Sequence, residues 1–193
     1  VVDEYLFARS ALGKLPMLSG KAGRLTSKPV LTGPYTLAKL SLSATPAMNA
    51  VESRAEAFAQ ALAAEVRALA EAGADLIQVD EPAILKYPQD WSIFREALEP
   101  LLRARQQPGE NGRRSALALC VYFHDSALLY EKLVSLPIDG LLLDFTYNPK
   151  LVHVVAAAGS PIPLGLGLVD GRNTKLEDAA TLARQVEALL PKV

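Results

Sequence analysis

The chain has 193 residues and a mass of 20.7 kDa, and half of its residues are hydrophobic, which suffices for one domain with a sizeable core. Its 20 lysines and arginines nearly balance 21 aspartates and glutamates, so we expect neither a nucleic-acid-binding surface nor an acidic tail. The apolar runs are short and interrupted, which excludes a membrane span, and the single Cys120 cannot form a disulfide framework. Without a secretory leader we expect a cytoplasmic protein, and the start at Val1 suggests part of a longer polypeptide.

The N-terminal third of the sequence predicts two helical regions and one strand. Residues 5–7 suggest a helix or an arm, and residues 12–26 form an irregular segment. The apolar run 30–32 predicts a short strand. Apolar side chains then recur at steps of three and four over residues 51–72, which predicts an amphipathic helix, and Gly73 follows where a left-handed C-terminal cap is wanted.

The rest of the chain alternates apolar runs with stretches of helical period. The runs are rich in Leu, Val and Ile with little polar alternation, as in strands that are covered on both faces. They are Leu76–Asp80, Leu117–Tyr122, Gly140–Asp144 and Leu164–Val169. Helices are predicted at about 91–105, 125–135, 148–158 and 176–190, with Asp125, Asn148 and Asn173 as N-caps, and a loop at 106–114. This alternation predicts a mostly parallel sheet with right-handed crossovers.

Polar residues at the strand ends decide between the two common parallel architectures. One such residue falls at or just beyond the C-terminal end of each predicted strand: Thr32, Asp80 with Glu81, Tyr122, Asp144 and Asp170. Convergence at one end is typical of the mouth of a (β/α)8 TIM barrel, whereas a dinucleotide fold would carry GxGxxG after its first strand. Because five strands cannot close an eight-stranded barrel, we predict an α/β fold of incomplete barrel type. Residues 1–193 would then form a single barrel domain that is truncated at both ends.

The segment QVDEPA contains the strongest local signal. Asp80 and Glu81 end a predicted strand, and Pro82 turns the chain away from the mouth. A carboxylate at that place can hold a substrate ammonium group through charge-assisted hydrogen bonds. An Asp-Glu pair that only stabilises the loop is the competing interpretation.

The segment LTGPYT provides a second set of candidate contacts. Gly33 imposes a tight turn, Thr32 offers a hydroxyl, and Tyr35 offers a ring on which a ligand could stack. A plain turn between a strand and a loop explains the same residues without any ligand.

The segment GLGLVDGRN provides the third set. Gly165 and Gly167 lie within a predicted strand, where the absent side chains permit close approach of backbone or ligand. Asp170 and Arg172 follow at the mouth, and an arginine there suits a carboxylate or a phosphate. An internal ion pair between these two residues is the alternative.

A metal site has weaker support in the sequence. Cys120 and Asp144 could supply two ligands, but zinc takes three or four protein ligands. His124 lies beyond its strand, Tyr122 is a poor zinc ligand, and His153 falls on a predicted helix. We therefore expect no metal and no other cofactor in this chain.

Four segments in order resemble cobalamin-independent methionine synthase: KPVLTGPYTLAKLS, AGADLIQVDEPAI, LCVYF and GLVDGRNTKLE. The resemblance implies one of the family's two related (β/α)8 barrels, about strands three to seven. It also implies zinc-dependent methyl transfer from 5-methyltetrahydrofolate to homocysteine by the family, with the substrate amine held at Asp80. The catalytic barrel has a His-x-Cys pair where this chain has Cys120-Val121-Tyr122, and a histidine where it has Arg172. The chain thus resembles the metal-free N-terminal barrel, or a short single-barrel relative, more than the catalytic one.

Three functions remain open at this point. The first is part of a methionine-synthase-like methyltransferase that lacks the full zinc site. The second is a non-catalytic module that binds a small amino-acid or folate-like ligand, a partner barrel or a second copy of itself. The third is a relative of uroporphyrinogen decarboxylase, which needs several arginines at the barrel mouth, of which only Arg172 is available.

Overall fold

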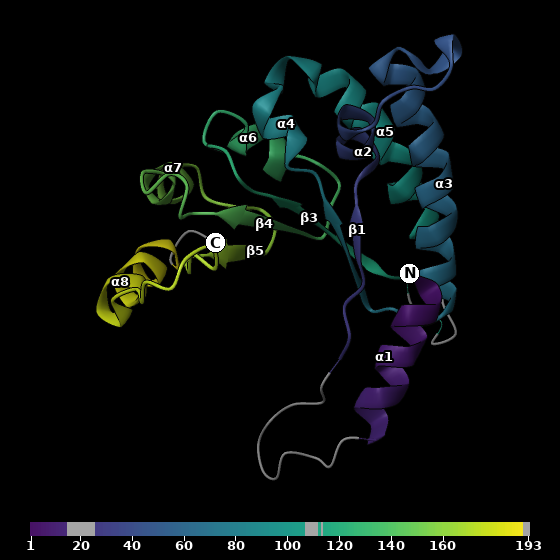
Figure 1. Ribbon diagram of the computed structural model, residues 1–193. Coiled ribbons are helices and arrows are strands. Elements are labelled where there is room, and N and C mark those ends of the chain that lie inside the picture. The colour runs from purple at the N-terminus through teal and green to yellow at the C-terminus, as the bar shows by residue number, and fades with distance from the viewer. Residues whose placement is uncertain (15–25, 107–111, 113, 191–193) are drawn as a thin grey trace.

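The computed structural model describes residues 1–14, 26–106, 112 and 114–190. Their centre is a parallel sheet of five strands in the order β1-β2-β3-β4-β5, in which neighbours in sequence are neighbours in space. The strands are β1 (Val30–Thr32), β2 (Leu76–Asp80), β3 (Ala116–Val121), β4 (Gly140–Asp144) and β5 (Leu164–Gly167). The sheet curves, as Figure 1 shows, so it has the architecture of an open piece of a barrel.

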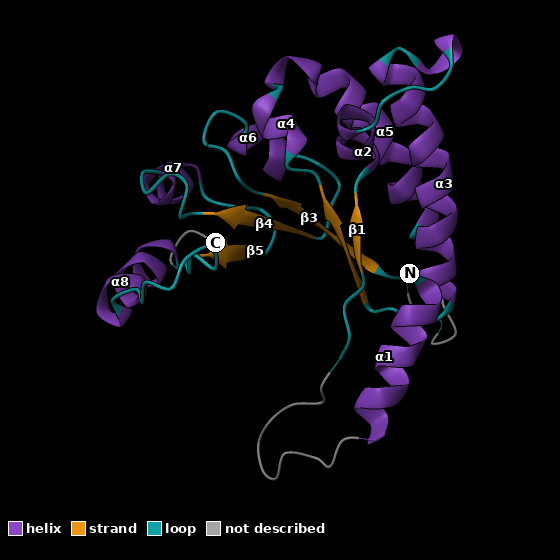
Figure 2. Cartoon of the chain, in the orientation of Figure 1, coloured by secondary structure: helices purple, strands orange, loops and turns teal. Residues whose placement is uncertain are grey.

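Helices lie between successive strands, before the first strand and after the last, and those between the strands cover the outer face of the sheet (Figure 2). They are α1 (Val2–Lys14), α2 (Pro34–Leu40), α3 (Val51–Glu71), α4 (Ala83–Lys86), α5 (Trp91–Ala104), α6 (Tyr130–Val134), α7 (Leu151–Ala158) and α8 (Ala179–Leu189), with 3-10 turns η1 (Pro46–Met48) and η2 (Pro88–Asp90). The largest helix contacts join α3 to α5 and α2 to α3. No helix in the described ranges is long and apolar enough to cross a membrane.

Strand parity separates the core from the inner face. Ile77 and Val79 on β2 are fully buried against the helices, as are Leu117 and Leu119 on β3. The alternate positions, which include Asp80, point to the concave side. The hydrophobic core therefore lies between sheet and helices, and the inner face is free to carry polar groups.

Three predicted strands, 30–32, 76–80 and 140–144, are confirmed to the residue. The third strand lies one residue earlier than predicted, and the fifth ends at Gly167. The fifth strand packs closely on the fourth: a Cβ at Gly165 would come within 2.7 Å of Leu142 Cγ, and one at Gly167 within 2.8 Å of the Leu143 carbonyl oxygen. The predicted close approach of backbone at these glycines is thus confirmed.

The later helices are shorter than predicted, and their caps differ. The helix predicted from 125 begins only at Tyr130, because Asp125 accepts a hydrogen bond from the Ala127 backbone and shapes a turn instead. The prediction of Asn173 as an N-cap is wrong, since Asp178 caps α8 by accepting from the Thr181 amide.

Two further predictions concern the limits of helices and loops. Asn148 binds the Lys150 amide one turn before α7 begins at Leu151, so it shapes the entry to the helix rather than capping it. The predicted irregular segment 12–26 and the loop 106–114 fall largely outside the described residues.

Candidate functional site

The parallel register brings the C-terminal ends of all five strands to one edge of the sheet. Thr32 pairs with Asp80, Asp80 pairs with Cys120, and Asp144 pairs with Gly167. We call this edge the rim and define it by the polar residues that sequence reasoning placed there: Thr32, Asp80, Tyr122, Asp144, Asp170 and Arg172. Within the rim the side chains form two separate groups, one around Asp80 and one around Asp144.

Asp80 is the centre of a hydrogen-bonded chain on the inner face. Gln78 Nε2 donates to Asp80 Oδ1 at 2.7 Å, and the Tyr122 hydroxyl donates to Oδ2 at 3.1 Å. Lys28 Nζ donates in turn to Gln78 Oε1. Burial, followed by the charge of Asp80, raises the pKa of Tyr122 to about 12, so this phenol keeps its proton and remains a donor.

The orientation of Asp80 is therefore fixed from two sides. The described contacts use one hydrogen bond on each carboxylate oxygen, although each oxygen can accept more than one. The half-buried Asp80 retains acceptor capacity toward the concave side. It can accept a hydrogen bond from a cationic group such as a ligand ammonium.

Asp144, in contrast, uses its acceptors within the protein. Its Oδ1 accepts from the Thr146 amide at 2.9 Å, the Thr146 hydroxyl at 2.5 Å and the Tyr147 amide at 3.3 Å. Its Oδ2 lies 3.5 Å from the Phe123 amide and 4.0 Å from Arg172 Nη1. Asp144 thus stabilises the loop that follows β4.

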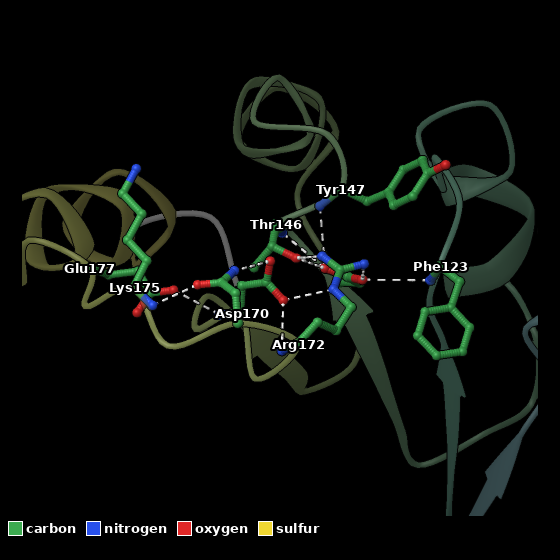
Figure 3. Close-up of polar contacts among 9 residues, drawn as sticks. Phe123, Thr146, Tyr147, Asp170, Arg172, Lys175 and Glu177 are labelled. Carbon is green, nitrogen blue, oxygen red and sulfur yellow. Dashed lines mark hydrogen bonds and ion pairs between the residues drawn. The ribbon is translucent and has the colours of Figure 1, made fainter.

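Arg172 joins the loops that follow β4 and β5, as Figure 3 shows. Its Nε donates to Asp170 Oδ1 at 2.6 Å, and its Nη2 donates to the Thr146 hydroxyl at 2.8 Å. The hydrogen bond from Arg172 holds the pKa of Asp170 below its usual range. The internal ion pair that sequence reasoning left open is present, so both side chains already have partners in the absence of a ligand.

A cavity of about 490 Å³ opens between β3, β4 and β5 at this part of the rim. Its lining combines apolar and polar groups, among them Cys120, Tyr122, Phe123, Leu142, Asp144 and Arg172. Phe123 has a φ of 71°, a left-handed conformation that is costly for an aromatic residue, and its side chain is 52% exposed. Sequence reasoning missed Phe123, because no glycine or asparagine marks a left-handed position there.

Tyr35 and Glu81 do not lie on the rim, and this corrects their prediction as ligand contacts. Both side chains have no exposed surface. The Tyr35 ring packs edge-on against Phe94 at 6.1 Å, and its hydroxyl donates to Asp90 Oδ2 at 2.8 Å. Glu81 accepts hydrogen bonds from Tyr35 and Thr36 in the first turn of α2, so its carboxyl is held inside the protein. Thr32 is exposed at the end of β1, where a ligand could reach its hydroxyl.

The residues of the rim do not fit a zinc ion. Burial, followed by the charge of Asp80, raises the pKa of Cys120 to about 12, so this thiol keeps its proton in the metal-free chain. Asp144 Oδ1 already accepts three hydrogen bonds from the loop that follows β4, and His124 packs against the Tyr147 ring at 5.7 Å. Among the described residues no three His, Cys, Asp or Glu side chains form a group that could hold a metal.

Comparison with known proteins gives a consistent family assignment. Residues 13–193 match the family described as cobalamin-independent synthase, N-terminal domain. A 5-methyltetrahydropteroyltriglutamate–homocysteine methyltransferase of Bifidobacterium animalis subsp. lactis is 36% identical over 97% of this chain, and one of Halalkalibacterium halodurans is 30% identical over 99%. The aligned parts make up 23% and 24% of those relatives, so the chain spans about a quarter of their length.

A solved structure supports the fold. A B12-independent methionine synthase from Shewanella sp. W3-18-1, solved in complex with selenomethionine, matches all of this chain and 55% of its own with a TM-score of 0.72. At a sequence identity of 20%, this match shows only that the two chains share a fold. The family match and the curated relatives confirm the resemblance in the motifs. The chain belongs to the cobalamin-independent methionine synthase family and corresponds to the N-terminal domain of that family.

Proposed function

We propose that this chain serves as part of the N-terminal barrel of a protein that transfers a methyl group to homocysteine without cobalamin. Its membership in the family supports the proposal, as does the similarity to methyltransferases along nearly the whole chain. The chain's own part is structural: it supplies a curved sheet and a polar rim, and the methyl transfer takes place elsewhere in the protein.

The donor set of the rim is the observation that carries this proposal, because the described residues bring together no three His, Cys, Asp or Glu side chains that could hold a metal. Homocysteine becomes a competent nucleophile when a metal holds its sulfur as a thiolate. The rim offers for that purpose one cysteine, a tyrosine that keeps its proton and a carboxylate whose Oδ1 already accepts three hydrogen bonds. This donor set suits hydrogen bonding to a ligand and does not suit activation of a thiol.

A turnover assay tests the proposal. The purified chain is mixed with 5-methyltetrahydropteroyltriglutamate, homocysteine and zinc, and methionine is measured by mass spectrometry. We expect no methionine above the level of a sample without protein. Zinc-dependent turnover by this chain alone would contradict the proposal.

A second candidate function is binding of a small ligand with an ammonium group at Asp80. The free acceptor capacity of Asp80 and its fixation by Gln78 and Tyr122 favour this candidate. Calorimetric titration with homocysteine should show binding to the unmodified chain and at least tenfold weaker binding to Asp80→Asn. Asp125→Asn is the matched control, because an asparagine oxygen can still accept the Ala127 hydrogen bond. Equal affinity in all three proteins, or no binding to any of them, would exclude a site at Asp80.

A further inference from the structure

A cavity on the outer side of the sheet separates α5 from the short helix α6. Both helices lie on that side, away from the concave face that carries Asp80 (Figure 2). The main contacts of α5 are with α3 and α2, whereas the backbones of α5 and α6 stay largely apart. Because α6 has only 5 residues, it cannot run alongside the 14 residues of α5. The space between them is a cavity of about 550 Å³, a size that suits a small-molecule ligand.

Apolar side chains that are anchored in the core line this cavity. Leu98 and Leu102 line it from α5, and Leu136 lines it from the turn after α6; all three are buried. Trp91 lies on the same face of α5, seven residues before Leu98, and its ring packs against the buried Phe94 at a centroid distance of 5.2 Å. The cavity therefore has a fixed hydrophobic wall against which an apolar ligand body can pack.

The charged residues of the lining have an excess of cations. They are Arg95, Glu96, Glu99 and Arg103 on α5 and Lys132 on α6. Arg103 and Glu99 pair with each other at 3.5 Å, which leaves two cationic residues against one acidic residue. Among the described residues neither Arg95 nor Lys132 forms an ion pair. Cationic donors beside an apolar wall suit an anion that also carries an apolar group.

Lys132 reaches from α6 toward α5. Its Nζ lies 5.6 Å from the centroid of the Trp91 ring. Arg95 follows Trp91 by about one turn of α5, so both cationic side chains are neighbours of the same ring. In the described part of the chain no hydrogen bond or ion pair uses the Lys132 ammonium, so its three N–H groups remain available to a ligand.

We propose that the cavity between α5 and α6 binds a small organic anion with an apolar body. The anionic head, a carboxylate or a phosphate, accepts hydrogen bonds from Lys132 and Arg95. The apolar body packs along the three leucines and excludes water from them. This site lies on the opposite side of the sheet from the rim, so the inference goes beyond the proposed function and does not rest on it.

Fluorescence of the single tryptophan tests the site on the unmodified chain. The sequence has one tryptophan, so the emission of Trp91 reports on this cavity alone. The probe is 4-tert-butylbenzoate, and 4-tert-butylbenzyl alcohol offers nearly the same apolar body without the charge. We expect a saturable change of emission with the benzoate and binding of the alcohol that is weaker by at least about fivefold, because the alcohol cannot pair with the cations.

Two variants locate the anionic head. Lys132→Gln and Arg95→Gln should each weaken binding of the benzoate by at least about threefold and change binding of the alcohol by less than about twofold. Arg67→Gln, which changes an exposed arginine on α3 outside the cavity, is the matched control and should bind both probes as the unmodified chain does. Asp80→Asn should also leave both affinities unchanged, which distinguishes this site from a ligand at the rim.

The absence of a saturable change in Trp91 emission would overturn the inference, as would equal affinity for the benzoate and the alcohol. Unchanged binding of the benzoate in both Lys132→Gln and Arg95→Gln would also contradict it, because the charge of the probe would then be recognised elsewhere. The comparison of the two probes needs only the unmodified chain, so it remains decisive even if a variant does not fold. Neither homocysteine nor a metal is present, so failure of this site and failure of the proposed function are separate outcomes.

Discussion

The adjacent acidic residues Asp80 and Glu81 have different roles in this protein because their side chains point to opposite faces of the sheet. Asp80 is the last residue of β2 and points to the concave face, where Gln78 and Tyr122 orient it. Glu81 follows outside the strand and is buried among the first residues of α2. A carboxylate that can contact a ligand and a carboxyl that stabilises the loop therefore stand side by side in one motif.

The burial of Glu81 predicts a specific dependence of stability on pH. Since its pKa is raised in the folded state, its stabilising contribution is fully present below pH 4.5 and is lost as the pH rises through 7. From pH 5.5 to pH 8 the free energy of unfolding should fall by about 2 kcal/mol more in the unmodified chain than in Glu81→Gln. Urea unfolding of both proteins at the two pH values measures this difference. Parallel pH profiles would show that Glu81 does not titrate in this range.

The close packing of Gly33 against the Glu81 side chain predicts that a larger residue at position 33 destabilises the protein. Gly33→Ala would push a methyl group into the buried Glu81 carboxyl, and the free energy of unfolding should fall by about 1–3 kcal/mol. Gly171→Ala is the control, because no atom lies within 4 Å of the place that its added methyl group would take, and stability should change by less than about 0.5 kcal/mol. Urea unfolding that gives equal values for the two variants would contradict the tight packing at Gly33.

The pair of segments that meets at Glu81 also shows what the sequence could not predict at the residue scale. VDEPA and TGPYT were both recognisable as motifs, and their position at the strand ends followed from the alternation of elements. The burial of Tyr35 and Glu81 depends on contact between segments that are distant in the chain. Local spacing contains no information about that contact, so both residues were predicted to face a ligand.

At the scale of elements, the strands were predictable because β2 and β4 are continuous apolar runs between polar residues. The short helix α6 was not, because hydrogen bonds in the preceding loop decide where it begins. The edge of the sheet opposite the rim depends on another long-range contact. Arg105, at the end of α5, is buried and pairs with Asp139, which precedes β4 and also accepts from the Leu117 amide at 2.8 Å.

The connection through Arg105 predicts a large loss of stability on its removal. Arg105→Ala removes the buried guanidinium from Asp139, which keeps its ion pair with Arg114 at 2.8 Å, and should lower the free energy of unfolding by about 1.5–3 kcal/mol. Arg103→Ala removes an exposed ion pair with Glu99 one turn earlier on the same helix and should cost less than about 1 kcal/mol. Thermal or urea unfolding compares the two variants, and similar losses would contradict a structural role for the buried pair.

At the scale of the whole molecule, the five parallel strands place one polar side chain after another along a single edge, as the barrel prediction required. The two groups of polar side chains along that edge differ in the hydrogen-bond acceptors that they leave free for a ligand. The group around Asp144 and Arg172 is satisfied internally and holds two loops together, whereas Asp80 retains acceptor capacity. This division supports a barrel segment that positions side chains for a ligand. Among the described residues no three His, Cys, Asp or Glu side chains form a group that could hold a metal, which disfavours zinc chemistry at the rim.

The number of zinc ions bound per chain tests most directly the claim that the rim does not hold zinc. The purified chain is equilibrated with zinc at neutral pH, freed of unbound metal by gel filtration, and its zinc content is determined by mass spectrometry. We predict far less than one zinc per chain and the same value for Cys120→Ser. One zinc per chain that is lost in Cys120→Ser would contradict the account, because it would show that the rim deprotonates this thiol and holds a metal.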